Sequence, residues 1–338
     1  MKRRTLGGSG ISVSDVALGT MMFGARGNTD HEESVRMIHT ALDAGVNLVD
    51  TADVYSVGES EEIVAKALKG RRDEVVLATK FALPMGPDAN ERGGSPRYLK
   101  RAIDESLRRL GTDYVDLYQM RHPDYETDID ETLSALSDLV RAGKVRVIGS
   151  SMFPAELMVE ARWRAETGGH HRFRSEQLRY SVLSRTAEAH VLPTAQRYEV
   201  GVLSFSPLSG GWLSGRSDPT KGHRPTAAAK DFDLTNPANQ AKLEAVEKLT
   251  DLASEAGIAL AHLAIAFARS HPAVTSVLIG PRTPEQLDDL LAGADVELSQ
   301  DVLDRVDDIV LPGTELNPDD NYFSTPPAIL DKSLRRHP

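Results

Sequence analysis

The chain has 338 residues, of which 40% are hydrophobic, so it can bury a large core in one big barrel or in two domains. Thirty-nine Lys and Arg residues stand against 50 Asp and Glu residues, and the formal net charge of −11 argues against broad binding to nucleic acid or acidic membranes. There is no cysteine, which excludes disulfides, thiolate catalysis and cysteine-bound metals.

The first 15 residues, MKRRTLGGSGISVSD, predict a β-hairpin with a turn at Gly-Ser-Gly, which would close the bottom of a barrel. No apolar run of signal-peptide length follows the basic start, and no apolar run of about 18 residues occurs elsewhere. We therefore expect a cytoplasmic protein that does not bind or cross a membrane.

Short apolar runs that are typical of buried strands alternate with segments of helical periodicity. The strands are predicted over residues 16–20, 46–50, 75–80, 114–119, 145–150, 173–177, 200–205 and 274–280. Among the helices between them are 60–68, 96–110, 130–142 and 155–165. Eight such units without a Pro- or Ser-rich linker favour an α/β fold, a closed (β/α)8 TIM barrel that forms a single domain over residues 1–338.

Two connections are longer than ordinary strand-to-helix loops, residues 83–95 and residues 210–237. Both follow the carboxyl end of a predicted strand, the face where barrel enzymes build their sites. We expect both loops to be candidate lids, and the C-terminal tail over residues 312–338 is a third segment that could cover this face.

Three chemically useful side chains follow neighbouring predicted strands. Asp50 ends one strand, Tyr55 stands five residues later, and Lys80 ends the next strand. An ammonium group stabilises a phenolate, so a tyrosine beside Lys80 can pass its proton to a carbonyl oxygen, while a carboxylate pairs with the lysine. The alternative is a structural ion pair between Asp50 and Lys80, with Tyr55 packed on the rim.

Several longer motifs occur in a familiar order along the chain. They are RTLGGSGISVSDVALGTMMFG, NLVDTADVYSVGESEE, ATK, DLYQMRHPD, KVRVIGSS, SFSPLSGGWLSGR and VLIGPRTPEQLDDL. Over essentially its whole length the chain resembles the aldo-keto reductase family, and within it the bacterial members that are similar to potassium-channel β subunits. The resemblance implies a barrel that binds NADPH in extended form and a catalytic tetrad of Asp, Tyr, Lys and His. The first three members match Asp50, Tyr55 and Lys80.

The fourth member of the tetrad differs. The position of the family's His holds Arg121, and His122 follows it. Neighbouring strand residues point to opposite faces, so we expect Arg121 to face the site and His122 to point away, unless a bulge at the strand end turns His122 inward. Arg121 would bind the substrate oxygen and favour the tyrosinate, which tilts the chemistry towards alcohol oxidation or slow reduction. Alternatively, Arg121 pairs with Asp124 and has a structural role.

A phosphate site is predicted where VLIGPRTPEQLDDL passes from strand to helix. Thr283 and Pro284 begin the helix, and Gln286 has the spacing of a capping box. A helix N-terminus attracts phosphate, and Arg282 adds a cation. The resemblance implies that Arg282 holds the 2′-phosphate of NADPH, with Gln286 and Asp289 near the adenosine.

The resemblance implies further cofactor contacts at the strand ends. Phe205 would stack on the nicotinamide, and Ser151 and Gln177 would bind its carboxamide, although Met152 stands where relatives carry Asn. The other expected contacts are Thr20, Met21, Asp50, Ser206, Pro207, Leu208, Gly210, Arg216 and Gly280. Arg224 is a further candidate for the pyrophosphate.

The sequence thus predicts an oxidoreductase that uses NADP(H) to reduce carbonyl groups of aldehydes, ketones or sugar-like compounds, with Tyr55 as the proton donor. One alternative is an alcohol or sugar dehydrogenase that works in the oxidative direction. Another is a cofactor-binding sensor or regulatory subunit with negligible turnover. The expected partner is a small carbonyl or alcohol substrate, and no metal site is expected because the ten histidines show no ligand spacing. The sequence carries no signal for an oligomeric state.

Overall fold

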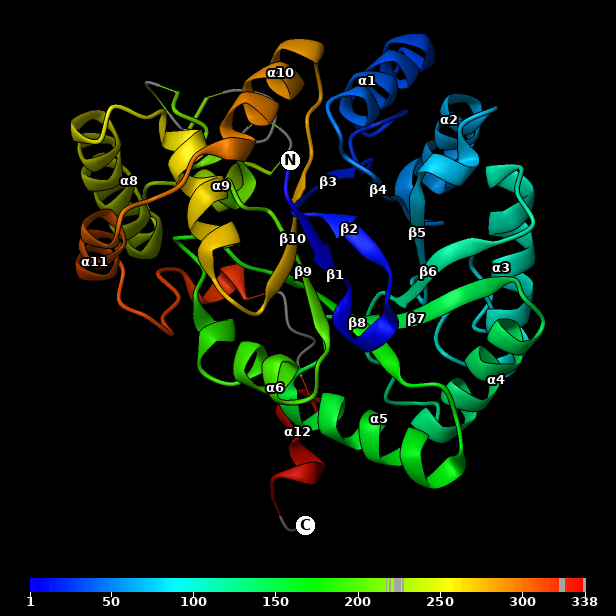
Figure 1. The fold of residues 1–338 in the computed structure, drawn as a ribbon. Helices are drawn as coiled ribbons and strands as arrows, with labels where there is room; N and C mark the ends of the chain where they lie inside the picture. The colour runs from blue at the N-terminus through cyan, green and yellow to red at the C-terminus, as the bar shows by residue number, and fades with distance from the viewer. Residues whose placement is uncertain (217, 219, 222–225, 227, 322–325, 337–338) are drawn as a thin grey trace.

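A closed barrel of eight parallel strands forms the centre of the molecule, and helices surround it (Figure 1). The computed structural model describes the chain except residues 217, 219, 222–225, 227, 322–325 and 337–338. Arg224, and parts of the predicted loop over 210–237 and of the tail, therefore lie outside the described residues. The strand order is β10-β3-β4-β5-β6-β7-β8-β9, which confirms the predicted (β/α)8 fold.

Each predicted strand overlaps one strand of the barrel. The barrel strands are β3 (Val16–Gly19), β4 (Leu48–Asp50), β5 (Val76–Phe81), β6 (Val115–Met120), β7 (Val145–Ser151), β8 (Phe173–Arg179), β9 (Gly201–Phe205) and β10 (Val274–Ile279). The helices are α1 (His31–Asp43), α2 (Glu59–Leu68), α3 (Pro96–Leu110), α4 (Ile129–Arg141), α5 (Ala155–Gly168), α6 (Val191–Arg197), α8 (Pro237–Glu255), α9 (Leu260–Ser270), α10 (Pro284–Ala292), α11 (Gln300–Ile309) and α12 (Pro327–Leu330).

Helix α3 shows why the sequence marks helix ends well. The Ser95 side chain accepts a hydrogen bond from the Tyr98 amide, and Pro96 occupies the first turn, where its missing N–H group costs nothing. Gly111 ends the helix in the left-handed conformation at φ 61°, which glycine adopts without a steric cost. The predicted bounds of this helix agree with the observed ones.

Strand alternation divides the apolar side chains into two groups. One group lies between the strands and the helices, and on β6 it includes Tyr118 and Met120. The other group fills the lumen of the barrel. Its members are Leu6, Val13, Ala17, Leu48, Ala78, Leu117, Leu203 and Leu278. On every strand, the residues two and four positions beyond a lumen residue therefore face the same side.

The N-terminal hairpin closes one end of the barrel. Strands β1 (Arg3–Thr5) and β2 (Ser12–Ser14) pair in antiparallel fashion, and Figure 1 shows them across the barrel opening. The turn is longer than Gly-Ser-Gly, because a 3-10 turn over Gly7–Ser9 precedes Gly10. Leu6 and Val13 are fully buried in the lumen group, so the hairpin is part of the core at the amino ends of the strands.

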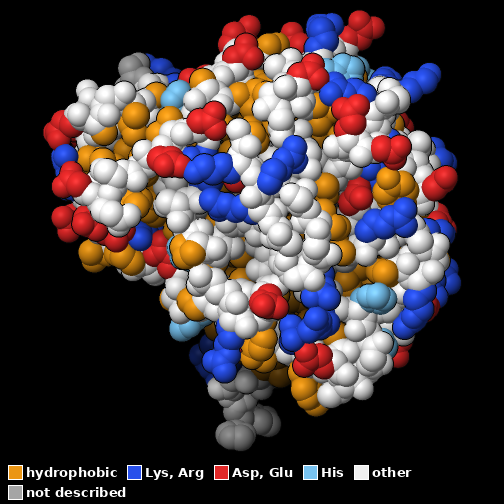
Figure 2. Space-filling view, in the orientation of Figure 1, with side chains coloured by type: hydrophobic (Ala, Val, Ile, Leu, Met, Phe, Trp, Pro, Cys, Tyr) orange, Lys and Arg blue, Asp and Glu red, His pale blue; other side chains and the backbone are white. Residues whose placement is uncertain are grey.

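No single helix in the described part of the chain has the length and apolar composition of a membrane span, and α8 and α9 reach it only as a pair bent by 94°. On the face seen in Figure 2, basic and acidic side chains are interspersed.

Replacing Leu6 with Ala should lower the free energy of unfolding by about 3 kcal/mol, since the change leaves a cavity in the closed end of the lumen. Urea denaturation would measure the loss. Ile11→Ala is the matched control, because Ile11 lies in the same hairpin and is only partly buried. Equal losses in the two variants would contradict the role given to Leu6.

Candidate functional site

A buried ion pair lies at the carboxyl ends of β4 and β5. The Lys80 ammonium donates to Asp50 Oδ2 at 2.5 Å, to the Thr51 carbonyl at 2.8 Å and to Tyr55 Oη at 3.2 Å. Lys80 is fully buried, and Asp50 and Tyr55 are nearly so. An ammonium group has three N–H donors, so all three are used. The Tyr55 oxygen thus accepts from Lys80, which leaves its own hydrogen available to another group.

Two buried amides hold the other oxygen of Asp50. Gln119 Nε2 and Gln177 Nε2 each donate to Asp50 Oδ1 at 3.0 Å. Gln177 was predicted to bind the cofactor, whereas Gln119 was not predicted at all. Alternation along β6 could have found it, because Gln119 stands two residues after Leu117, which faces the lumen.

Arg121 continues the same face of β6. Its Nη1 donates to Ser151 Oγ at 3.4 Å, and its guanidinium carbon lies 5.6 Å from the centre of the Phe205 ring. The structure thus brings together Arg121 and two of the predicted cofactor residues. In the described part of the chain, no ion pair joins Arg121 to Asp124, which instead accepts from the Gly94 amide and the Thr127 hydroxyl.

His122 occupies the next position, two residues after the end of β6 at Met120. Burial, and then the charge of Arg121, lower the pKa of His122 to about 4. The imidazole is therefore neutral at pH 7. The Arg121 backbone amide still bonds the Phe81 carbonyl, so the ladder continues past the end of β6 at Met120.

A buried carboxyl group lies behind Ser151. Glu176 accepts from the Ser150 hydroxyl at 2.5 Å and from the Phe153 amide at 3.0 Å, on the outer side of β7 and β8. Its complete burial raises its pKa to about 8, against the weaker effects of these hydrogen bonds and of Arg121. Glu176 is thus mostly protonated at pH 7.

Backbone strain gathers around the carboxyl ends of the strands. Apart from Glu199, the non-glycine residues with positive φ in the described chain follow β4, β5, β7 and β9. They are Ser56 (49°), Val57 (56°), Ala82 (96°), Met152 (61°), Ser206 (56°) and Ser209 (49°). Such conformations cost free energy and occur mostly at functional sites. Strain therefore marks the same end of the barrel as the ion pair.

The start of α10 has the features of a phosphate site. Thr283 caps the helix by accepting from the Gln286 amide, and Pro284 occupies the first turn. The Gln286 side chain accepts from the Arg282 amide at 2.9 Å, one residue before the position that a capping box would use. Asp289 lies away from this turn and bonds His262 at 3.1 Å.

The remaining predicted cofactor residues line the same end of the barrel. Thr20 is buried and bonds the Asp50 carbonyl and Ser60, and Met21 follows it. Ser206, Pro207 and Leu208 continue from β9. An added Cβ at Gly210 or Gly280 would have no atom within 4 Å. Arg216 is exposed and bonds the Lys221 carbonyl.

The C-terminal tail contributes a contact that the sequence does not reveal. The backbone carbonyl of Asp320 accepts a hydrogen bond from Arg179 Nη1 at 2.9 Å, and the Asp320 carboxylate pairs with the Lys242 ammonium at 2.7 Å. Arg179 also donates to Ser209 Oγ at 3.2 Å. All four residues are buried, so the described part of the tail is fastened beside the loop that follows β9.

The start of α10 fits a phosphate-bearing group such as a dinucleotide. Arg282, just before this helix N-terminus, forms no ion pair with any described residue. No group of three or more His, Asp or Glu side chains within the described ranges has an arrangement that would hold a metal ion.

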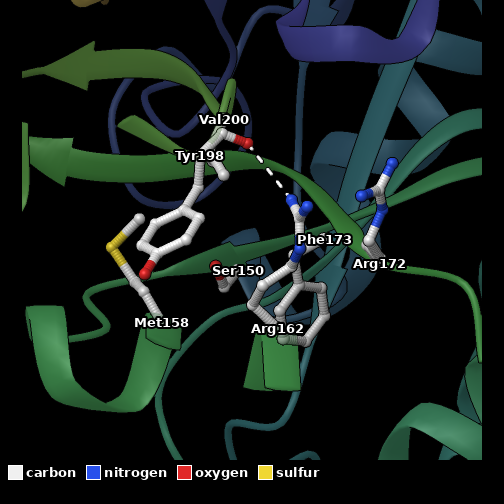
Figure 3. A pocket seen from close by; sticks show the side chains of 7 residues that line it. All are labelled: Ser150, Met158, Arg162, Arg172, Phe173, Tyr198 and Val200. Atoms are coloured by element: carbon white, nitrogen blue, oxygen red, sulfur yellow. Dashed lines mark hydrogen bonds between the residues drawn. The ribbon is translucent and has the colours of Figure 1, made fainter. Parts of the chain in front are cut away.

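A small cleft lies elsewhere, between α5, β8 and the start of β9. Figure 3 shows Tyr198 and Met158 side by side over Ser150, with Arg162 bonded to the Tyr198 carbonyl at 3.3 Å. Its lining includes none of the predicted site residues.

Known proteins are similar to this chain over most of its length. The model of the Aldo/keto reductase family matches residues 15–311. An uncharacterized oxidoreductase of Bacillus subtilis, YrpG, is 40% identical, covering 91% of this chain and 96% of that protein. A probable voltage-gated potassium channel subunit beta of Oryza sativa is 34% identical, with 92% and 97% covered. The versiconal hemiacetal acetate reductase of Aspergillus parasiticus is 32% identical, with 92% and 98% covered.

Stability should fall as the pH rises from about 5 to about 8. The pKa values of Glu176 and Asp53 are both raised to about 8, chiefly by burial, so the folded state holds protons that the unfolded chain has already released. The stabilisation by these protons is fully present below the pH range in which ordinary carboxyl groups titrate. It is lost as the pH rises to about 8. Glu176→Gln should make the unfolding free energy less dependent on pH over this interval. Equal slopes in the variant and the parent protein would contradict the protonation of Glu176.

Proposed function

The chain belongs to the aldo/keto reductase family, and we propose that it is an oxidoreductase that uses NADPH to reduce the carbonyl groups of small aldehydes, ketones or sugar-like compounds. The observation that carries this proposal is the set of three hydrogen bonds from Lys80. The match to a reductase of Aspergillus parasiticus and to an oxidoreductase of Bacillus subtilis is consistent with it.

In this mechanism, Tyr55 is the proton donor. The hydride for the carbonyl carbon would be supplied by NADPH when it is bound. Tyr55 gives its hydrogen to the carbonyl oxygen, and Lys80 stabilises the tyrosinate that remains. Asp50 keeps the ammonium in place, and Gln119 and Gln177 fix the orientation of that carboxylate.

The cofactor residues have separate tasks in this proposal. Arg282 and the N-terminus of α10 hold the 2′-phosphate, with Gln286 fixing the backbone at Arg282 and Asp289 near the adenosine. Phe205 carries the nicotinamide, and Ser151 binds its carboxamide. The other contacts come from the strand ends and from the loop after β9. They are Thr20, Met21, Asp50, Gln177, Ser206, Pro207, Leu208, Gly210, Arg216 and Gly280.

We also propose that residues 1–338 form one catalytic domain, with the hairpin over 1–15 at its base and the part of the tail over 312–321 at the active-site face. The bonds from Asp320 to Arg179 and Lys242 support this place for the tail, because Arg179 ends β8.

Oxidation of alcohols is the second candidate reaction, and one observation favours it. Arg121 is a permanent cation in the position where relatives carry His, and it forms no ion pair in the described chain. A second positive charge near Tyr55 stabilises the tyrosinate, which is the form that accepts a proton from an alcohol.

Tyr55→Phe should lower the rate of NADPH oxidation with aldehydes and diketones about 100-fold or more, because the phenyl ring has no proton to give. The spectrophotometric rate with purified protein measures the effect. Tyr114→Phe is the control, since Tyr114 lies at the amino end of β6. Full activity in Tyr55→Phe would remove Tyr55 as the acid. Tight NADPH binding without turnover in the parent protein would favour oxidation or a sensing role.

Arg282→Ala should weaken NADPH binding about tenfold or more and leave NADH binding nearly unchanged, because only NADPH carries the 2′-phosphate. Titration of both cofactors would measure the two dissociation constants. Arg305→Ala, which removes an exposed arginine paired with Glu255, is the control for the loss of one charge. Equal losses for NADPH and NADH would exclude the assignment of Arg282 to the phosphate.

A further inference from the structure

Arg121 is a cation whose hydrogen-bonding capacity is largely unused. A guanidinium group has five N–H donors. Among the described residues, only Nη1 has a partner, the Ser151 hydroxyl at 3.4 Å, and the half-buried side chain leaves Nε buried without one. A polar group in this state is costly unless a ligand completes its bonds.

The surrounding groups do not neutralise this charge. The Asp50 carboxylate is already paired with Lys80, and Asp124 is bonded to Gly94 and Thr127. Glu176 is mostly protonated at pH 7, since its pKa is raised to about 8 by burial. His122 is neutral there and adds no charge of either sign. The site therefore keeps one uncompensated positive charge.

The position of this charge suits a ligand that also reaches Tyr55. Arg121 lies two residues beyond Gln119 on the same face of β6, about 7 Å further along the strand. Gln119 bonds Asp50, and Asp50 pairs with the lysine that bonds Tyr55. A small molecule that bonds both Tyr55 and Arg121 would lie over this network.

We infer that Arg121 selects substrates that carry a carboxylate next to the reacting carbonyl, which are 2-oxo acids. This inference rests on the proposed function. A carboxylate offers two oxygens to the parallel N–H groups of a guanidinium, whereas a plain aldehyde offers one oxygen, which Tyr55 already takes. A site built to bond a polar group discriminates strongly against analogues that lack it.

Binding of a non-reducible mimic tests the inference without turnover. Oxamate has the carboxylate and neighbouring carbonyl of a 2-oxo acid, and oxamide is its neutral counterpart. Calorimetric titration of the protein with NADPH bound should give oxamate at least about tenfold tighter binding than oxamide. Arg121→Gln should bring this ratio close to one, and Arg121→Lys should keep part of it because the charge remains.

Arg146→Gln is the matched control, since it removes one exposed arginine at the amino half of β7 and should leave the ratio unchanged. Equal binding of the two compounds, binding of neither, or a ratio that survives in Arg121→Gln would each overturn the inference.

A rate measurement separates this inference from the proposed function. Turnover of neutral aldehydes without a preference for oxamate would leave the reductase proposal standing and remove the role of Arg121. A preference for oxamate without reduction of any 2-oxo acid or aldehyde would support the role of Arg121 in anion selection. It would contradict the proposal that the protein is a carbonyl reductase.

Discussion

The buried ion pair between Asp50 and Lys80 is the constraint on which the rest of the site depends. Two charges removed from water cost several kcal/mol each unless their remaining hydrogen-bonding positions are also filled. Here the Thr51 carbonyl and Tyr55 complete Lys80, while two amides complete Asp50. Residues at the ends of four strands must therefore stay in place together. The hydrogen bond from Lys80 then fixes the orientation of Tyr55.

The barrel could be predicted from the sequence because its signals are local. Apolar runs mark the eight strands, and a cap, a proline and a glycine mark the ends of α3. Strand-end reasoning also singled out Asp50, Tyr55 and Lys80, which hydrogen bonds join in the structure. Gln119 was missed because it does not end a strand motif, although alternation from Leu117 places it in the lumen, where it bonds a carboxylate 69 residues away. The bond between Arg179 and Asp320 spans 141 residues and carries no local pattern at all.

The strained backbone conformations lie at the carboxyl ends of the strands, where the site also lies. Where a parallel strand ends, the chain must turn sharply, and at Met152 and Ser206 it does so with non-glycine residues at positive φ. Met152 is fully buried in the core between strands and helices, so packing compensates for part of the strain. Asparagine tolerates this conformation better than methionine does.

The hairpin at the base of the barrel affects the route by which a proton can reach Tyr55. Leu6 and Val13, with Ala78 and Leu117 above them, make the lumen apolar beneath Asp50 and Lys80. These four aliphatic side chains carry no hydrogen-bonding group that could pass a proton upward from below. In the proposed mechanism, Tyr55 would regain its proton from the solvent at the strand ends, through the opening by which the product alcohol would leave. The product alcohol would then leave first, and Tyr55 would be protonated again afterwards through the same opening.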